Sequence, residues 1–387
     1  MFTYHIPTKL YFGEGQLLNL GKVTSEYGKK VLIVYGGGSI KKTGVYDTVC
    51  NQLKENNIEI FELAGIEPNP KVDSVRKGIE ICKKEKIDVV LAVGGGSAMD
   101  ASKFIAAGAC VDFDVWDFIS KKAPVQNVLP LLCVLTISAT GSEMDNTAVL
   151  NNPDTEDKLA LINDKLFPVA SFCDPTLTYS VSKYQTACGS ADILSHIMEV
   201  YFNRNQELYM LDTQMEGMMK TVLKYAPIAL NNPENYEARA NLMYTSSWAI
   251  NGYIFGCNKA PWSCHAMEHQ LSAVYDITHG LGLAILTPRW MEYVLDESTL
   301  PKFYSFAVNV CDIPESEDKM SVAKQGIDYI KDFLYNKLEL KSTLSAIGID
   351  DSSFQKMADK ACGVNGFING WKKLYPQDVY NIYKNSL

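Results

Sequence analysis

The sequence predicts an α/β domain with a parallel sheet, followed by an all-helical domain. In the first half of the chain, short apolar runs rich in β-branched residues alternate with segments of helical periodicity. From about Thr178 onward the strand pattern disappears and long helical patterns follow. The chain of 387 residues is longer than one core usually supports, so two domains are expected, 1–178 and 179–387.

The elements of the first half alternate between strand and helix. Fully apolar strands in this order are typical of a parallel sheet covered on both faces. The predicted strands and helices follow one another at 29–38, 43–57, 58–66, 72–87 and 88–97. Another buried strand is predicted in VLPLLCVLTIS, and the turn residues NNPDTEDK between AVL and LALIN predict a hairpin.

The second half contains long segments rich in Met, Ala, Leu and Tyr. Their apolar residues recur with helical spacing, which predicts an all-helical domain. These segments are YQTACGSADILSHIMEVYF, ELYMLDTQMEGMMKTVLKYA, YEARANLMYTSSWAINGYI and MSVAKQGIDYIKDFLYNKL.

Composition excludes several classes of protein. The formal net charge is −9, with 36 Lys and Arg against 45 Asp and Glu, so a nucleic-acid or anionic-membrane surface is not expected. No apolar run reaches the roughly 18 residues of a membrane span. The ten cysteines form no C-x-x-C pair, which favours buried thiols in a reducing compartment. Without a visible secretory signal, a cytoplasmic protein is expected.

Two glycine turns follow predicted strands and precede predicted helices. The free N–H groups of a helix start can bind phosphate, and glycine leaves no Cβ between backbone and ligand. Neither turn matches the G-x-G-x-x-G fingerprint, and glycine can also serve the backbone alone. In the second turn, Ser97 and Asp100 also have the spacing of a capping box. The turn residues are Gly37, Gly38 and Ser39, and Gly94, Gly95, Gly96 and Ser97.

Two further patterns extend the predicted nucleotide site. TISATGSE places the hydroxyls of Thr136 and Thr140 after another buried strand, where they form either a third wall of the site or a polar turn. Ser39 is followed by Lys41 and Lys42. Serine with nearby lysines tolerates a 2′-phosphate, so NADP(H) is preferred over NAD(H); a solvated helix start is the alternative for these lysines.

Three of the five histidines fall within HAMEHQLSAVYDITHG. His265 and His269 are four positions apart, so on a helix they share one face, and His279 follows. Asp192 and His196 have the same spacing upstream. Imidazoles and a carboxylate suit Fe²⁺ or Zn²⁺, whereas neutral histidines satisfied in a core are the alternative. A metal and a nucleotide together favour alcohol oxidation or aldehyde reduction.

The sequence resembles the iron-containing (group III) alcohol dehydrogenases, most closely the NAD(P)H-dependent butanol dehydrogenase branch. The resemblance implies a Rossmann-like nucleotide-binding domain followed by an all-helical metal-binding domain, as in the dehydroquinate synthase-like fold, and a homodimer. It is carried by YGGGSIKKTG, EPNP, VGGGSAMDASK, TGSE, GSADILSHIMEVY and HAMEHQLSAVYDITHGLGLAI.

The resemblance also implies roles for individual residues. The metal, Fe²⁺ or alternatively Zn²⁺, would be bound by Asp192, His196, His265 and His279. His269 would instead line the pocket of a short-chain alcohol or aldehyde substrate and assist proton transfer. The cofactor would be bound by Gly37, Gly38 and Ser39 at the adenosine side, by Gly94, Gly95, Gly96, Ser97 and Asp100 around the pyrophosphate, and by Thr136, Thr140, Lys158 and Leu177 elsewhere.

The sequence departs from the family pattern at two positions, and two other functions are alternatives. Asp145 stands where close relatives usually carry Asn, and Ser138 where Pro or Ala is common, so Asp145 is expected to weaken or reorient a nucleotide contact. A glycerol dehydrogenase-like or dehydroquinate synthase-like enzyme is an alternative, although a cyclic phosphorylated substrate would need more cations near the histidines than Lys259. A non-catalytic sensor of nucleotide and metal is another, disfavoured by the complete ligand set and both glycine turns.

Overall fold

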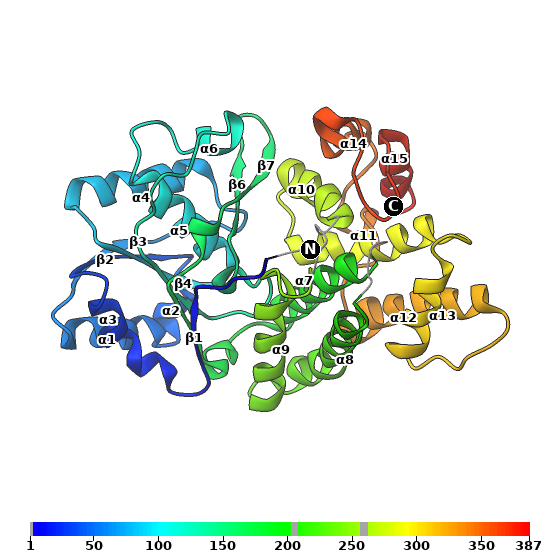
Figure 1. The fold of residues 1–387 in the computed structure, drawn as a ribbon, viewed down its shortest axis with the longest axis horizontal. Coiled ribbons are helices and arrows are strands. Elements are labelled where there is room, and N and C mark those ends of the chain that lie inside the picture. Colours follow the sequence, from blue (N-terminus) through cyan, green and yellow to red (C-terminus); the bar gives the residue numbers. More distant parts are fainter. Residues whose placement is uncertain (1–2, 203–207, 256–261) are drawn as a thin grey trace. The chain divides into compact units, whose positions relative to one another are not determined.

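The computed structural model describes residues 3–202, 208–255 and 262–387 (Figure 1). Lys259, considered above as a cation near the histidines, lies outside the described residues. None of the described helices is both long enough and apolar enough to cross a membrane.

The described residues group into two compact units. One unit combines His5–Val181 with Pro233–Asn251, and the other consists mainly of Ser182–Asn232 and Gly252–Leu387. The segment 233–251 therefore belongs by its contacts to the unit that contains the sheet, although its sequence pattern grouped it with the helical part. The predicted division of the chain after residue 178 stays a prediction.

The first unit is built on a six-stranded parallel sheet, which confirms the predicted α/β class. The strand order is β1-β8-β5-β4-β2-β3. Parallel neighbours need crossover connections; helices supply those from β2 to β3, from β3 to β4 and from β4 to β5, whereas a hairpin lies between β5 and β8. The strands are β1 Lys9–Phe12, β2 Lys30–Tyr35, β3 Glu59–Leu63, β4 Val89–Gly94, β5 Leu131–Leu135 and β8 Ala170–Cys173.

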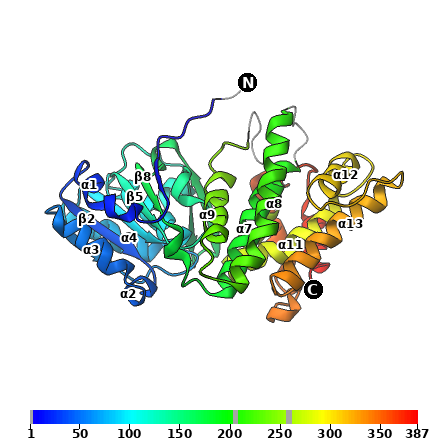
Figure 2. The ribbon, with the colours of Figure 1, turned by 90° about the horizontal axis from the view of Figure 1, so that it is seen from below.

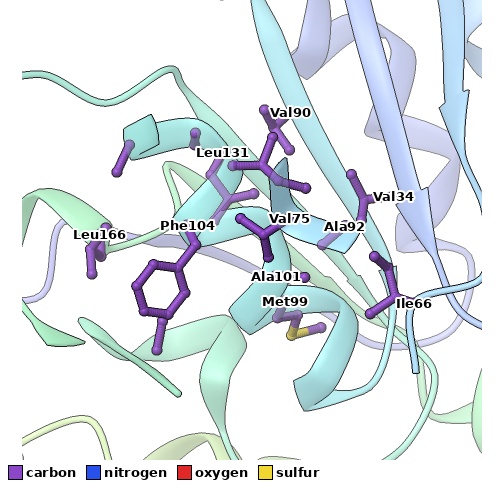
Figure 3. Close-up of a cluster of buried hydrophobic side chains, with 14 of the residues drawn as sticks. Val34, Ile66, Val75, Val90, Ala92, Met99, Ala101, Phe104, Leu131 and Leu166 are labelled. Atoms are coloured by element: carbon purple, nitrogen blue, oxygen red, sulfur yellow. The ribbon is translucent and has the colours of Figure 1, made fainter. Parts of the chain in front are cut away.

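Helices cover both faces of this sheet (Figure 1). Their side chains and those of the strands form two buried cores, one on each face. Successive side chains of a strand point to opposite faces, so Val90 and Ala92 of β4 enter one core while Leu91 enters the other. In Figure 3, Val75 and Phe104 from the covering helices lie in the first of these cores. The helices are α1 Leu20–Ser25, α2 Ser39–Lys42, α3 Val45–Glu55, α4 Val72–Glu85, α5 Gly96–Gly108 and α6 Asp117–Ser120.

The predicted hairpin is present as two antiparallel strands, β6 Thr147–Asn152 and β7 Asp157–Ile162. It contacts α5, which places it beside the second glycine turn of the sheet. The helix α9 Tyr236–Ala249 completes this unit and contacts the short 3₁₀ turns at Ser142–Met144 and Pro175–Thr178.

The second unit is helical, as predicted; its described residues contain only an isolated β-bridge between Ile368 and Leu374. Helix α7 packs against both α8 and α11, which Figure 2 also shows. The helices are α7 Lys183–Tyr201, α8 Tyr209–Asn231, α10 Ser263–Tyr275, α11 His279–Val294, α12 Leu300–Asn309, α13 Lys319–Asp332, α14 Phe354–Cys362 and α15 Pro376–Lys384.

A buried lysine ties α5 to the segment that leads into the hairpin. The Lys103 side chain is 0% exposed, and its ammonium group binds the Asp145 carboxylate. It also donates to the backbone oxygens of Asp145 at 3.0 Å and Thr147 at 2.7 Å, so all three of its donors are used. The charge of Asp145 is therefore balanced within the protein. The expected disturbance of a nucleotide by this carboxylate finds no support in its position.

We expect Lys103→Met to lower the free energy of unfolding by about 3–5 kcal/mol, because the buried Asp145 carboxylate then lacks its cation. Urea denaturation followed by circular dichroism measures the change. Lys121→Met is the matched control: it removes an exposed pair with Asp117, and its expected cost is below about 1 kcal/mol. Equal losses of stability in the two variants would contradict this assignment.

Candidate metal centre and nucleotide site

Helix α7 carries the first two predicted metal ligands into the interior of the helical unit. Ser182 caps the helix by accepting a hydrogen bond from the backbone of Gln185. Every residue of α7 from Thr186 to Tyr201 is buried, so Asp192 and His196, one turn apart, face other helices instead of water.

Two neighbouring helices supply the other histidines. His265 lies in the first turn of α10, and His279 is the first residue of α11. Gly280 and Gly282 permit close packing here. A Cβ on Gly280 would lie 2.0 Å from the backbone oxygen of Cys188 on α7, and one on Gly282 would lie 2.7 Å from the Cγ of Glu268 on α10. These glycines therefore let α11 bring His279 against both helices.

The predicted ligands converge on one carboxylate oxygen. The Nε2 atoms of His196 and His265 each lie 3.7 Å from the Asp192 Oδ1, and the Nε2 atom of His279 lies 3.6 Å from it. Donors bound tetrahedrally to one ion at about 2.1 Å are separated by about 3.4 Å. Ligand atoms of Asp192, His265 and His279 also lie within 4.8 Å of one another, a group that does not include His196. The spacing therefore fits these three donors around one cation, and His196 adjoins them through its approach to Asp192.

Two of these donor atoms are buried without a hydrogen-bond partner. Among the described residues, the Oδ1 atom of Asp192 and the Nε2 atom of His265 have none. Leaving such atoms unpaired in a protein interior is costly, so each orphan calls for a ligand. Three imidazoles and a carboxylate are a donor set that suits Fe²⁺ or Zn²⁺. The residues present therefore fit the metal that the sequence implies.

The members of the cluster shift one another's pKa values in different directions. Burial lowers the pKa of His196 to about 3, which keeps its ring neutral and able to act as a ligand near pH 7. Burial also opposes a charge on His265, but Glu199 and Asp192 outweigh it and raise the pKa of His265 to about 10, so a metal ion binding there would replace a proton on this ring. Burial works against the Asp192 carboxylate too, yet the surrounding histidines hold the pKa of Asp192 below its usual range.

Two buried glutamates that were not predicted from the sequence bind the second ring nitrogens of two of the histidines. His265 Nδ1 is hydrogen-bonded to Glu199 on α7, and His279 Nδ1 to Glu268 on α10. Glu199 also accepts from the backbone N–H of Cys264 at 2.8 Å, which fixes the start of α10. A carboxylate on the second ring nitrogen orients a metal-binding histidine and fixes its tautomer. Their spacing was the available signal, because each glutamate follows a predicted ligand by three positions.

His269 lies beside this cluster. Its ring centroid is 5.7 Å from that of His279 and 6.3 Å from that of His265. A ligand atom of His269 groups with Glu268 and His279, a different set from the one around Asp192. Its predicted place next to the ligands thus agrees with the geometry, while its role stays a prediction.

The first glycine turn links β2 to α2 in the other unit. Gly38 adopts a left-handed conformation with φ 92°, which favours glycine, and Ser39 begins α2. A Cβ added to Gly37 or Gly38 would meet no atom within 4 Å, so both glycines border open space. The open turn leaves room for a ligand to approach its backbone.

The second glycine turn is closed in by the segment after β5. Gly94 pairs with Leu135, so Thr136 emerges beside the turn. A Cβ on Gly96 would lie 2.5 Å from the Oγ1 atom of Thr140. The structure thus brings the predicted residues Gly94 to Ser97 together with the Thr136–Thr140 segment.

Asp100 is engaged with neighbouring protein groups. Its carboxylate accepts hydrogen bonds from Ser142 Oγ at 2.7 Å and from the Val149 backbone at 3.0 Å. Burial raises the pKa of Asp100 to about 6, although Lys103 opposes this. The capping-box alternative is wrong, because α5 begins at Gly96 and Ser97 therefore lies inside the helix.

The last two predicted cofactor residues occupy separate positions. Lys158 on β7 is buried and donates to Asn69 Oδ1 at 3.0 Å, which joins the hairpin to the EPNP segment. Leu177 lies in the 3₁₀ turn after β8 and packs against the core beneath the sheet. Their contact with a nucleotide stays a prediction.

Comparison with known proteins identifies the family. The model of the iron-containing alcohol dehydrogenases matches residues 7–175, and that of the C-terminal part of the Fe-containing alcohol dehydrogenase family matches residues 186–387. The NADH-dependent butanol dehydrogenase A of Clostridium acetobutylicum is 47% identical over 100% of this chain and 99% of its own. The NADPH-dependent aldehyde reductase of Escherichia coli is 34% identical over 93% of this chain and 92% of its own.

A solved structure agrees with these matches along the whole chain. The crystal structure of NADH-dependent butanol dehydrogenase A from Thermotoga maritima is 37% identical, covers 100% of this chain and 98% of its own, and has a TM-score of 0.94. Both halves of the chain, including the helices that carry Asp192 and His265, lie within the matched residues. The chain belongs to the iron-containing (group III) alcohol dehydrogenase family, within its butanol dehydrogenase branch.

Proposed function

We propose that this protein is a metal-dependent NAD(P)H alcohol dehydrogenase and aldehyde reductase that interconverts short-chain primary alcohols and aldehydes by hydride transfer. The observation that carries the proposal is the convergence of three histidines on the buried, unpaired Oδ1 atom of Asp192. Relatives named for butanol dehydrogenation and aldehyde reduction support the substrate class.

Each group of residues in the helical unit has one task in this proposal. A divalent ion, Fe²⁺ or alternatively Zn²⁺, supplies a Lewis acid for the alcohol or carbonyl oxygen, while the nicotinamide takes or gives the hydride. Asp192, His196, His265 and His279 hold the ion, and Glu199 and Glu268 orient two of these rings. His269 lines the substrate pocket and accepts the proton released when the alcohol is oxidised.

The α/β unit binds the nucleotide in this proposal. Gly37, Gly38 and Ser39 contact the adenosine side, and Gly94–Gly96 with Ser97 bind the pyrophosphate through backbone N–H groups at the start of α5. Asp100 acts by holding Ser142 and the hairpin in place. The relatives are named for both NADH and NADPH, so the predicted preference for NADP(H) stays a prediction, as do the cytoplasmic location and the homodimer.

Turnover of an aldehyde tests the proposal directly. The protein is stripped with a chelator, reconstituted anaerobically with Fe²⁺ or Zn²⁺, and given butanal with NADH or NADPH. We expect metal-dependent loss of absorbance at the reduced nicotinamide band. Absence of this activity with every short aldehyde would refute the proposal, and oxidation of glycerol alone would favour the glycerol dehydrogenase-like alternative.

Alanine variants separate the metal ligands from the pocket residue. We expect His265→Ala to abolish metal retention, because one of the converging donors is lost. His269→Ala should retain the metal and slow turnover. Metal content by mass spectrometry and kcat with butanal measure the two effects, and equal loss of metal in both variants would show that the roles are wrongly divided.

The buried glutamates should tune metal affinity. Glu199→Gln and Glu268→Gln keep the side-chain shape but remove the charge behind His265 and His279, so we expect metal affinity to fall about 10–100-fold. Competition with a chromophoric chelator measures the affinity. Glu292→Gln, which changes an exposed partner of Lys331, is the control, and a loss of the same size there would rule out a specific role.

A further inference from the structure

Four side chains form a compact cluster beside the first glycine turn, which we call the Glu62 cluster: Tyr35, Lys41, Tyr46 and Glu62. The Glu62 carboxylate accepts hydrogen bonds from Tyr35 Oη at 2.7 Å, from Lys41 Nζ at 3.4 Å and from the Tyr46 hydroxyl. The Lys41 ammonium also lies 4.4 Å from the centroid of the Tyr46 ring and 5.2 Å from that of Tyr35. The lysine is therefore held between a carboxylate and two aromatic faces.

This arrangement changes the role expected of Lys41. From the sequence, Ser39 with Lys41 and Lys42 is predicted to tolerate a 2′-phosphate. In the structure, Lys41 is paired with Glu62, whose carboxylate balances its charge. Burial disfavours the ionised carboxyl, but Tyr46, Tyr35 and Lys41 outweigh it and lower the pKa of Glu62. Glu62 is therefore an anion near pH 7.

The cluster lies at the carboxyl end of the sheet, next to the turn. β2 and β3 are parallel neighbours in which Ile33 pairs with Glu62. Just beyond, the backbone N–H of Gly65 donates to the oxygen of Gly36 at 3.1 Å, which joins the end of β3 to the glycine turn. The Glu62 side chain is 37% exposed, so it remains accessible to a ligand bound at this turn.

The position of the carboxylate indicates what it recognises. In nucleotide-binding α/β sheets, an acidic residue at the end of the strand after the glycine turn accepts a hydrogen bond from the ribose 2′-hydroxyl. The same residue repels a 2′-phosphate, because it places like charges side by side. β3 is the strand that follows this turn and its helices along the chain.

We infer that Glu62 sets the nucleotide preference of this protein and favours NAD(H), by accepting from the ribose 2′-hydroxyl and by withholding Lys41 from a 2′-phosphate. The inference rests on the proposed function for its cofactor and reverses the NADP(H) preference predicted from Ser39 and the lysines. Glu62 determines which nucleotide is preferred, and hydride transfer itself does not require its charge.

Binding of adenosine nucleotides tests the inference without turnover. Calorimetry with AMP and with adenosine 2′,5′-bisphosphate, which differ only in the 2′-phosphate, measures the ratio of the two dissociation constants. We expect the unmodified protein to favour AMP, and Glu62→Gln to shift the ratio toward the bisphosphate by about tenfold or more. The ratio of kcat/KM for NADH and NADPH should move in the same direction.

The same strand offers a matched control. Glu59→Gln changes an exposed carboxylate at the opposite end of β3, paired with Lys30, and should leave the ratio within about twofold. A ratio unchanged by Glu62→Gln, or an unmodified protein that prefers the bisphosphate, would overturn the inference. If nucleotides bind but no aldehyde is reduced, the proposed function fails while the binding ratio still decides the role of Glu62. Failure to bind either nucleotide would refute both.

Discussion

A buried carboxylate surrounded by three imidazoles is the constraint on which the helical unit depends. Asp192 is 3% exposed, and the three nearest ring nitrogens are those of residues from three different helices, α7, α10 and α11. Two further buried carboxylates, Glu199 and Glu268, stand behind the rings. So much negative charge in a protein interior requires a cation, either a proton on an imidazole or a metal ion. The packing of the helices and the chemistry of the site are thus set by the same charges.

The α/β unit also balances a buried carboxylate, here with a lysine. Lys103 of α5 is buried and pairs with Asp145, while Asp100 binds Ser142 and the start of the hairpin. Glu143 in the same TGSE segment accepts from Ser247 on α9 at 2.5 Å, which is one of the contacts that join α9 to this unit. These contacts position the segment that closes over the second glycine turn. Several residues of the TGSE segment therefore hold the loop in place by binding other protein groups.

The two glycine turns differ in what surrounds them. Gly37 and Gly38 border open space, whereas Gly95 and Gly96 are needed for close approach to Ile137 and Thr140. The first turn is flanked by the Glu62 cluster and so carries charge, while the second offers mainly backbone N–H groups and hydroxyls. In the proposed function, discrimination between nucleotides therefore belongs to the first turn, and binding of the shared pyrophosphate to the second.

Local pattern predicted much of the fold and several members of the site. The apolar runs at β2, β4 and β5 and the i,i+4 pair on α7 are local signals, and the structure has them where the sequence placed them. β8 has only four residues, Ala170–Cys173, and pairs with β1, which lies near the start of the chain. No local pattern therefore marks it.

The sequence by itself determined the element types and the family, because periodicity and motifs are properties of neighbouring residues, and the resemblance to that family predicted the donor residues. Tertiary structure alone decided how their charges are shared. Lys41 has no evident partner in the sequence, but in the structure this residue of α2 is paired with Glu62 of β3, and Asp145 is likewise paired with Lys103 of α5. Glu199 and Glu268 likewise acquire a function only when folding places them behind His265 and His279. Electrostatic partners are chosen by distance in space, and the distance between residues in sequence does not reveal it.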